Sequence, residues 1–332
     1  MIHMYELLGK VAPTALALRA NSTSAARRFN PHIDRIIEQN IDLPKSLIDD
    51  QETLIAESLH TQFWANTEQR TAKLKQVYSE LSEPEDLIVM ICCKNFCVFL
   101  ELWIQSCEKN NIAVRDKTLI FTLDAQANSQ VNRMGFKSYL FDPNIYQQGG
   151  GAERYGDHDF RRTMFYKNAA IFESLKLGAN ILFQDVDLIW RKDPFIYLKE
   201  HNPSSQIQIM YDGPNRRHYP YYANTGFIYL KNEAVCRAVS ETALRNTAAI
   251  FKLGGHQPPF NRICHHFAVH NLLNLSVLPE SLFLNGHLFN TSSGLKPAAE
   301  TWQTDGIVIH YSWTGDCADK IRKLEKFDYF KS

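Results

Sequence analysis

The sequence predicts an α/β protein in which a mixed, mostly parallel sheet carries helices on both faces and follows a helical N-terminal extension. Apolar runs of strand length occupy residues 87–92, 118–123 and 180–183, and segments with helical spacing of apolar residues lie between them. Because these runs are apolar throughout, they indicate strands buried on both faces, as in parallel sheets. Aspartate or histidine follows several predicted strands, and such sheets bind ligands at the carboxyl ends of their strands.

The remaining elements follow from the same periodicities. Residues 1–84 combine polar residues with leucine and isoleucine at three-to-four spacing, which indicates a few amphipathic helices ahead of a second unit at 85–332. Helices are expected at 96–107 and 160–177, and Gly178 would cap the second of them. Further strands are expected at 138–141, 206–211, 226–230 and 306–310, and a glycine-rich loop at 149–151.

The charge of the chain is balanced, because lysine plus arginine and aspartate plus glutamate both number 36 among 332 residues. A chain without net charge lacks the basic field that accompanies nucleic-acid binding, so we expect no nucleic-acid partner. The composition is 45% hydrophobic, and a chain of this length can bury a large core without disulfides or structural metals. A small-molecule or protein partner is therefore expected.

Seven cysteines, an odd number without paired CxxC spacing, indicate buried free thiols and a reducing compartment. No segment approaches the roughly 18 uninterrupted apolar residues of a membrane-spanning helix, and Pro13 interrupts the apolar stretch near the N-terminus. We therefore expect neither a signal peptide nor a transmembrane segment, and a cytoplasmic location. Peripheral association with a membrane stays open, as does the oligomeric state.

The most informative segment is the pair Asp185 and Asp187, which follows the strand predicted at 180–183. Residues two apart in an extended chain point to the same side, so both carboxylates can face one ligand. Two adjacent buried negative charges require a compensating cation, and carboxylate oxygens suit Mg²⁺ or Mn²⁺. The alternative is a solvated turn, which the apolar residues on both sides of the pair make less plausible.

Five blocks in the second half of the chain resemble the nucleotide-diphospho-sugar transferase family, which includes the retaining enzymes of glycosyltransferase family 77 with relatives in families 8 and 24. The blocks are residues 167–194 with Asp185-x-Asp187 and Trp190-x-x-Asp193-Pro194, then Asp212, then Asn224-x-Gly226-Phe, then Gln257-x-x-Phe-Asn261, and finally His310-x-x-Trp313 followed by Lys320. The resemblance implies a GT-A fold for residues 85–332. It also implies transfer of a sugar from a nucleotide donor, expected to be a UDP-sugar, with retention of anomeric configuration. The acceptor could be a glycan, a lipid-linked glycan or a protein.

The resemblance also implies the ligands of a Mn²⁺ or Mg²⁺ ion. Asp187 and His310 would bind the ion, Asp185 would contact the ion or the donor ribose, and Lys320 would lie near the diphosphate. Neutral imidazole is a suitable third ligand beside carboxylates. For His310 alone, a strand-end histidine held by a hydrogen bond is the alternative, and for Lys320 it is a solvated lysine.

The donor pocket is expected to begin at the first strand end, with Lys94 and Asn95, and to place Asp124 near the base or ribose. Asn95 is explained equally well as a helix N-cap. Arg162 and Lys167 lie on the helix before the Asp185 strand and could neutralise phosphate.

Asn224 and Gln257 are the candidates nearest the anomeric carbon, where an amide can hold an acceptor hydroxyl or steady an oxocarbenium-like centre. Asp212 is the carboxylate available for a double displacement, although we favour attack on the same face of the donor that the nucleotide leaves. His256 and Pro258-Pro259 depart from the acidic and polar residues common in the family at these positions. The acceptor contacts are therefore expected to differ.

An aromatic cluster could form a platform for the acceptor or simply pack in the core; it comprises Tyr211, His218, Tyr219, Tyr221, Tyr222 and Trp313. Residues 1–84 could recognise the acceptor, mediate oligomerisation or bind a partner. The competing functions are a nucleotidyltransferase, a phosphohydrolase with an Asp-x-Asp motif, and a non-catalytic sugar-binding protein. Phosphohydrolases of that kind place the motif on their first strand, whereas here it lies in the middle of the chain.

Overall fold

The computed structural model describes residues 50–141, 158–213, 215, 221–290, 305–314, 317–318 and 320–321. Seven strands form the main sheet in the order β3-β2-β1-β4-β7-β6-β8. They are β1 (Asp86–Cys92), β2 (Thr118–Thr122), β3 (Lys137–Leu140), β4 (Asn180–Gln184), β6 (Ile207–Tyr211), β7 (Ala223–Leu230) and β8 (Leu275–Val277). Only β7 runs antiparallel to its neighbours, so the predicted mixed, mostly parallel sheet is confirmed.

A second, three-stranded sheet has the order β5-β10-β9, from β5 (Leu188–Trp190), β9 (Phe283–Asn285) and β10 (Val308–His310). The strand expected at 306–310 is present as β10, but it belongs to this small sheet. Only residues 185–187 separate β4 from β5, so the chain passes from the main sheet to the small one through the two aspartates. The sequence alone did not reveal β5, β8 or β9.

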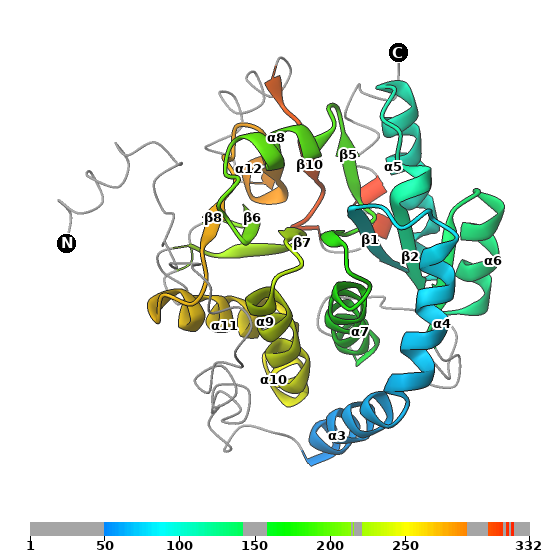
Figure 1. Cartoon of the computed structure of the whole chain (residues 1–332), viewed down its shortest axis with the longest axis vertical. Helices are drawn as coiled ribbons and strands as arrows, with labels where there is room; N and C mark the ends of the chain where they lie inside the picture. Colours follow the sequence, from blue (N-terminus) through cyan, green and yellow to red (C-terminus); the bar gives the residue numbers. More distant parts are fainter. Residues whose placement is uncertain are drawn as a thin grey trace.

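Helices cover both faces of the main sheet, as the sequence predicts (Figure 1). They are α3 (Asp50–Ala65), α4 (Thr67–Ser79), α5 (Cys97–Lys109), α6 (Ala125–Arg133), α7 (His158–Leu175), α8 (Pro194–Glu200), α9 (Ala234–Arg245), α10 (Thr247–Lys252), α11 (Gln257–Val269) and α12 (Gly286–Asn290). Alternate side chains of β1 enter two different cores: Leu87 and Val89 pack with α7 and α9, and Ile88 and Met90 with α5 and the small sheet. This two-sided burial explains why the strand is apolar throughout.

The described part of the predicted N-terminal extension, α3 and α4, packs on the same core as the sheet through Leu59, Phe63 and Leu74. A buried ion pair of 2.9 Å joins Arg70 on α4 to Glu173 on α7. Removing one partner of a buried pair leaves an uncompensated charge, so this contact strongly favours one position of α4 against α7. The domain boundary near residue 84 stays a prediction, and residues 1–49 lie outside the described residues.

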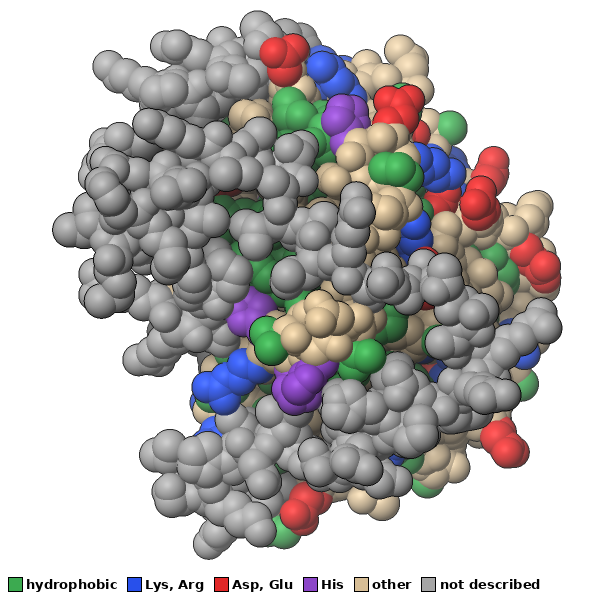
Figure 2. All heavy atoms as spheres, turned by 60° about the vertical axis from the view of Figure 1, so that its left-hand side comes forward, with side chains coloured by type: hydrophobic (Ala, Val, Ile, Leu, Met, Phe, Trp, Pro, Cys, Tyr) green, Lys and Arg blue, Asp and Glu red, His purple; other side chains and the backbone are tan. Residues whose placement is uncertain are grey.

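All seven cysteines are free thiols, and six of them are buried, as predicted. The glycine-rich loop expected at 149–151 lies outside the described residues. Within the described ranges, no helix has both the length and the apolar character to cross a membrane. On the face shown in Figure 2, visible acidic and basic side chains are interspersed along one edge, in keeping with the balanced charge of the chain.

Candidate active site

A cavity of about 520 Å³ opens where the parallel strands of the main sheet end. Its wall includes Cys92 at the end of β1, Leu123 just after β2 and Asp185 just after β4. Helix α7, the start of β7, the start of α11 and the segment after β10 also contribute to the wall. Parallel strands bring their carboxyl ends to the same edge, which is why residues far apart in the sequence meet here.

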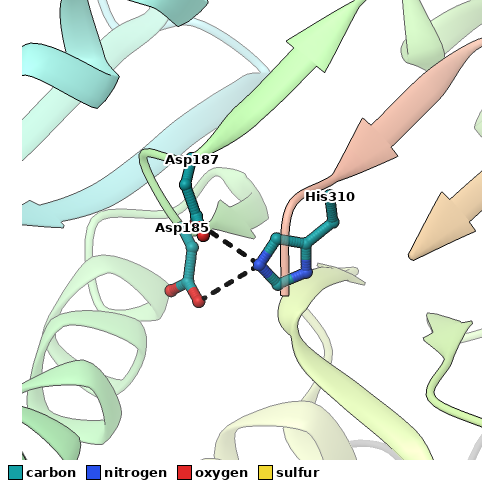
Figure 3. A group of neighbouring side chains, drawn as sticks. All are labelled: Asp185, Asp187 and His310. Atoms are coloured by element: carbon teal, nitrogen blue, oxygen red, sulfur yellow. Dashed lines mark ion pairs between the residues drawn. The ribbon is translucent and has the colours of Figure 1, made fainter. Parts of the chain in front are cut away.

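Asp185, Asp187 and His310 form a three-residue cluster in this cavity (Figure 3). One ligand atom from each lies within 4.8 Å of the others. Imidazole Nε2 of His310 is 3.3 Å from Asp187 Oδ1 and 3.6 Å from Asp185 Oδ2. Ligands of Mg²⁺ sit at about 2.1 Å in octahedral geometry, which puts adjacent ligand atoms about 3.0 Å apart. Small side-chain adjustments would therefore let the three atoms bind one divalent ion.

The backbone explains this convergence. The Asp185 N–H donates to the Gly226 carbonyl on β7 at 2.9 Å, which fixes the turn out of the main sheet. His310 is paired with Leu188 in the antiparallel ladder of β10 and β5, so it lies beside the aspartate pair. The Tyr311 N–H donates to the Asp187 carbonyl at 3.1 Å. The small sheet, which the sequence did not reveal, is what brings His310 to the aspartates.

The hydrogen bonds around Asn224 determine which nitrogen of His310 is held by the protein and which faces the aspartates. The Gly226 N–H donates to Asn224 Oδ1 at 2.9 Å, which identifies this atom as the amide oxygen. His310 Nδ1 lies 3.0 Å from the same oxygen and must therefore donate to it. Nε2 is therefore the nitrogen that faces the two carboxylates. A ring whose Nδ1–H is held by a second group presents Nε2 to a metal in the orientation that ligation requires.

Each aspartate also forms an ion pair with a lysine, through the oxygen that does not face His310. Asp185 pairs with Lys167 on α7, and Asp187 pairs with Lys320. Burial raises the pKa of Asp187, but Lys320 and His310 outweigh it and hold that pKa well below its ordinary value. The two carboxylates and two ammonium groups cancel in charge. A divalent ion added to this group would leave an excess of positive charge, which suits a diphosphate.

Gly226 leaves the space that this cluster needs. A Cβ at this position would lie 2.2 Å from His310 Cε1 and 2.7 Å from Asp185 Oδ2. Any larger residue would therefore displace two of the three candidate ligands. The Asn-x-Gly pattern of the sequence contained this signal, although only the structure reveals its reason.

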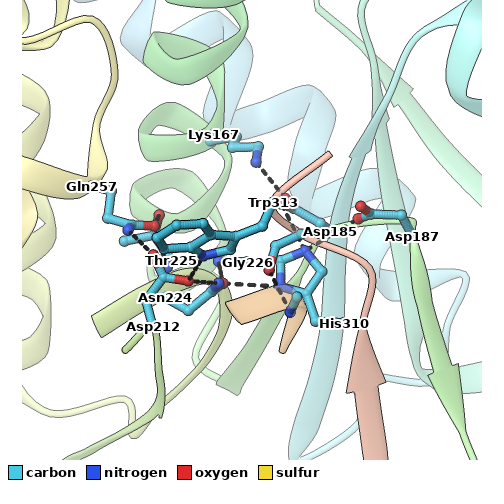
Figure 4. A network of polar contacts seen from close by, with 12 residues as sticks. Lys167, Asp185, Asp187, Asp212, Asn224, Thr225, Gly226, Gln257, His310 and Trp313 are labelled. Atoms are coloured by element: carbon cyan, nitrogen blue, oxygen red, sulfur yellow. Dashed lines mark hydrogen bonds and ion pairs between the residues drawn. The ribbon is translucent and has the colours of Figure 1, made fainter. Parts of the chain in front are cut away.

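A second polar cluster surrounds Asp212, which is 7% exposed and lies just after β6 (Figure 4). Its carboxylate accepts hydrogen bonds from Asn224 Nδ2 at 2.6 Å, Gln257 Nε2 at 2.7 Å and Trp313 Nε1 at 3.1 Å. Gln257 in turn accepts from the backbone N–H of Thr225 at 3.2 Å and from its hydroxyl at 3.1 Å. The amide of Gln257, at the start of α11, is thus oriented at both ends.

The cavity brings together the predicted metal ligands, the predicted catalytic residues and two predicted phosphate-binding lysines; they are Asp185, Asp187, His310, Asp212, Asn224, Gln257, Lys167 and Lys320. Four predicted donor-binding residues, Lys94, Asn95, Asp124 and Arg162, are not among its lining residues.

The structure shows the local surroundings of three of these four. Asp124 is the N-cap of α6: its oxygens accept from the N–H groups of Ala127 at 2.7 Å and Lys94 at 2.8 Å. Arg162 lies 4.0 Å from Asp159 on the same helix. Asn95 lies inside a short 3-10 turn, residues Lys94–Phe96, rather than at the N-cap of α5. Contacts of these residues with a donor remain predictions.

Residues that sequence reasoning did not assign to the site include Thr225, Met164 and His256, all of which line the cavity. Burial, and then the nearby charge of Lys167, lower the pKa of His256 well below its ordinary value, so the ring is neutral. Of the predicted aromatic cluster, Tyr222 and Trp313 line the cavity, whereas Tyr221 is buried against His265. His218 and Tyr219 lie outside the described residues.

The profile of the nucleotide-diphospho-sugar transferase family matches residues 113–324, which are about two thirds of the chain. The matched range contains the candidate metal ligands and the whole cluster around Asp212. The chain therefore belongs to this family. The predictions of the family and of a glycosyltransferase are confirmed.

Two relatives are named as enzymes that transfer a sugar from a UDP donor. UDP-D-xylose:L-fucose alpha-1,3-D-xylosyltransferase 3 of Arabidopsis thaliana is 25% identical over 281 residues, which cover 78% of this chain and 70% of that protein. UDP-galactose:fucoside alpha-3-galactosyltransferase of Dictyostelium discoideum is 28% identical over 134 residues, or 38% of this chain and 18% of that protein. Much of the second relative thus has no counterpart in the aligned region.

Among solved structures, the galactosyltransferase LgtC, in complex with donor and acceptor sugar analogues, aligns with 72% of this chain and 94% of its own at 14% identity and a TM-score of 0.43. Mouse xyloside xylosyltransferase 1 aligns with 70% of this chain and 99% of its own at 12% identity and a TM-score of 0.43.

Proposed function

We propose that this chain is a divalent-metal-dependent glycosyltransferase that transfers a sugar from a UDP-sugar to a hydroxyl of an acceptor sugar, with retention of anomeric configuration. The observation that carries the proposal is the convergence of Asp185, Asp187 and His310 Nε2 in one cavity, with two lysines on the outer oxygens of the carboxylates. Mn²⁺ or Mg²⁺ suits this donor set of two carboxylates and one imidazole.

The lysines and the metal would act together on the donor diphosphate. When bound, the ion withdraws charge from the phosphate oxygens and so stabilises the UDP leaving group. Lys320 is paired with Asp187 in this structure, and its ammonium group would be released for phosphate oxygens once a cation compensates that carboxylate. Lys320 would then contact the diphosphate, whereas Lys167 would keep its contact with Asp185 and hold it in position from α7.

The Asp212 cluster would orient the reacting sugar. In the favoured route the bond from the anomeric carbon to the phosphate oxygen breaks, the acceptor oxygen attacks from the same face, and the leaving phosphate takes the acceptor proton. Gln257 and Asn224 present amide groups whose positions are fixed by Asp212. Three neutral donors on Asp212 reduce its nucleophilicity, which favours this route over a double displacement through Asp212.

The relatives suggest the kind of acceptor. The names of the Arabidopsis and Dictyostelium proteins specify fucose or a fucoside as acceptor and xylose or galactose as transferred sugar. We therefore propose a deoxyhexose or a related sugar, free or within a glycan, as the acceptor class, with UDP-xylose and UDP-galactose as the first donors to assay.

The test combines binding with turnover. Wild-type protein is expected to gain thermal stability with Mn²⁺ and UDP together, because a ligand that binds only the folded state stabilises it, and EDTA should abolish the gain. With Mn²⁺, one UDP-sugar should yield UDP and a glycoside of L-fucose or its methyl glycoside. Asp187→Ala is expected to lose the stabilisation and about 10³-fold in kcat/KM, because a metal contributes several kcal/mol to stabilising the leaving charge.

Glu101→Ala on α5 is the matched control, since it removes an exposed carboxylate outside the cavity. Release of inorganic phosphate without sugar transfer, or turnover that EDTA leaves unchanged, would contradict the proposal. The first result would favour a phosphohydrolase instead.

A further inference from the structure

Trp313 is the one large hydrophobic side chain, among those that the described residues expose, that also lines the cavity. It is 54% exposed, whereas Asp187 and His310 in the same cavity are 7% and 3% exposed. The indole therefore lies toward the outer side of the cavity and the metal ligands toward its inner side. Figure 4 shows the ring between Gln257 and the group of Asp185 and His310.

The position of the ring is fixed by contacts with two other elements. Its Nε1–H donates to Asp212 Oδ1 at 3.1 Å, the same buried carboxylate that orients Gln257. The imidazole of His287, on α12, lies 5.4 Å away between ring centres, at 53°. An exposed indole usually samples several rotamers, so this anchoring indicates a ring that is held ready for a ligand.

The backbone under Trp313 is also unusual. Its φ of +60° lies in the left-handed region, which a bulky non-glycine residue rarely adopts. The neighbouring chain makes room for this turn at Gly286, where a Cβ would lie 1.8 Å from the Ser312 carbonyl oxygen and 3.1 Å from Trp313 Cβ. A disfavoured backbone conformation that persists beside a required glycine is typical of functional sites. Here the effect is to turn the indole into the cavity.

We propose that Trp313 is the platform for the acceptor sugar, which stacks an apolar C–H face on the indole and directs a hydroxyl toward Gln257 and Asp212. The inference rests on the proposed function and adds the acceptor subsite to it. The donor diphosphate would occupy the inner, charged side of the cavity. The indole, on the outer side, would then contact the acceptor sugar, which enters from solvent after the donor has bound. An indole has an extended apolar face with a polar edge, and here Asp212 already holds that edge.

The test measures how the donor sugar is divided between water (hydrolysis) and the acceptor sugar (transfer). It compares three proteins: wild type, Trp313→Ala and Trp313→Phe. Each is assayed with Mn²⁺, the active UDP-sugar and methyl α-L-fucopyranoside or another methyl glycoside that the wild type accepts. For Trp313→Ala we expect the ratio of UDP-sugar hydrolysis to transfer to rise about tenfold or more, because water needs no stacking surface. The KM for the acceptor should rise as well. Trp313→Phe keeps a ring and should restore most of the transfer.

Two controls separate the possible failures. Ile196→Ala removes another exposed apolar side chain, 60% exposed on α8 and outside the cavity, and should partition as the wild type does. Stabilisation by Mn²⁺ and UDP verifies that each variant is folded. An unchanged ratio in Trp313→Ala, or an equal loss of hydrolysis and transfer, overturns the platform. A wild type that binds no Mn²⁺ with UDP and cleaves no UDP-sugar refutes the proposed function itself.

Discussion

Asp187 and Asp212 are equally buried, each 7% exposed, but the protein compensates their charges in opposite ways. Asp187 is in contact with Lys320 and His310, which hold its pKa low. Asp212 accepts from Asn224, Gln257 and Trp313, all neutral donors. The first carboxylate lies among groups that carry or can carry positive charge, and the second among neutral groups held in fixed orientations.

This difference separates the two tasks of a transferase. A region that exchanges a lysine for a divalent ion can bind and release a charged nucleotide. A region of amides and indole is suited to a neutral sugar, whose hydroxyls need directional hydrogen bonds more than charge. We infer that the charged side of the cavity determines whether a donor binds, and that the neutral side determines how the sugars are oriented for transfer.

The largest effect that tests this comparison is expected from Asp212→Asn. One carboxylate oxygen becomes an NH₂ group, which must then face a donor N–H of Gln257 or of Asn224 and Trp313. With the amide of Gln257 misdirected, kcat for transfer should fall by about 10²–10³-fold, a typical cost of losing one oriented group at a reacting centre. Steady-state kinetics would measure it.

In the same variant, binding of Mn²⁺ with UDP should stay within about threefold of the wild type, because Asp212 is not part of the metal cluster. A parallel loss of nucleotide binding and kcat would show that the two regions are not separate. It would also remove the distinction between charged and neutral sides.

A smaller effect is expected from Gly226→Ala, which tests the charged region. The new Cβ would displace His310 and Asp185, so affinity for Mn²⁺ in the presence of UDP should fall about 10–100-fold, as for changes that misorient metal ligands. Titration calorimetry would measure it. Gly255→Ala is the matched control: its Cβ would make ordinary contacts of 3.6 Å with Phe160 and 3.8 Å with Met164, and it should bind the metal as the wild type does.

The smallest effect is a pH dependence that reports on His256. Burial, followed by the charge of Lys167, lowers the folded-state pKa of this histidine from 6.5, so below that pH the unfolded chain binds a proton that the folded chain excludes. The contribution of His256 to the free energy of unfolding is therefore fully present above about pH 6.5. It decreases as the pH falls below that value, by at most about 1.4 kcal/mol per pH unit.

Urea unfolding in EDTA at pH 7.5 and 5.5 would measure this loss. The His256→Gln variant lacks the titrating group, so its free energy of unfolding should fall by about 1 kcal/mol less than that of the wild type. Parallel losses in the two proteins would mean that His256 is protonated in the folded state, and that the region around Gln257 carries a charge.

Much of the fold could be predicted because strands buried on both faces leave a continuous apolar run in the sequence. The runs at 118–123 and 180–183 correspond to β2 and β4 within one residue at an end. Strands of three residues, such as β5 and β9, are too short to show a period, and they were missed. Asp124 was expected near the donor, but capping and ligand binding use the same residue type at the same place, the end of a strand before a helix.

The sequence by itself determined the long strands of the central sheet, the pair of aspartates at a strand end and the family to which the chain belongs, because these depend on local order and spacing. The tertiary structure decided how the site is completed. His310 follows Asp187 by more than a hundred residues, and only the pairing of β10 with β5 brings its Nε2 within 3.3 Å of that carboxylate. The neutral surroundings of Asp212 likewise arise from α11, β7 and the segment after β10, because side chains from separate elements can share one carboxylate only after those elements have packed.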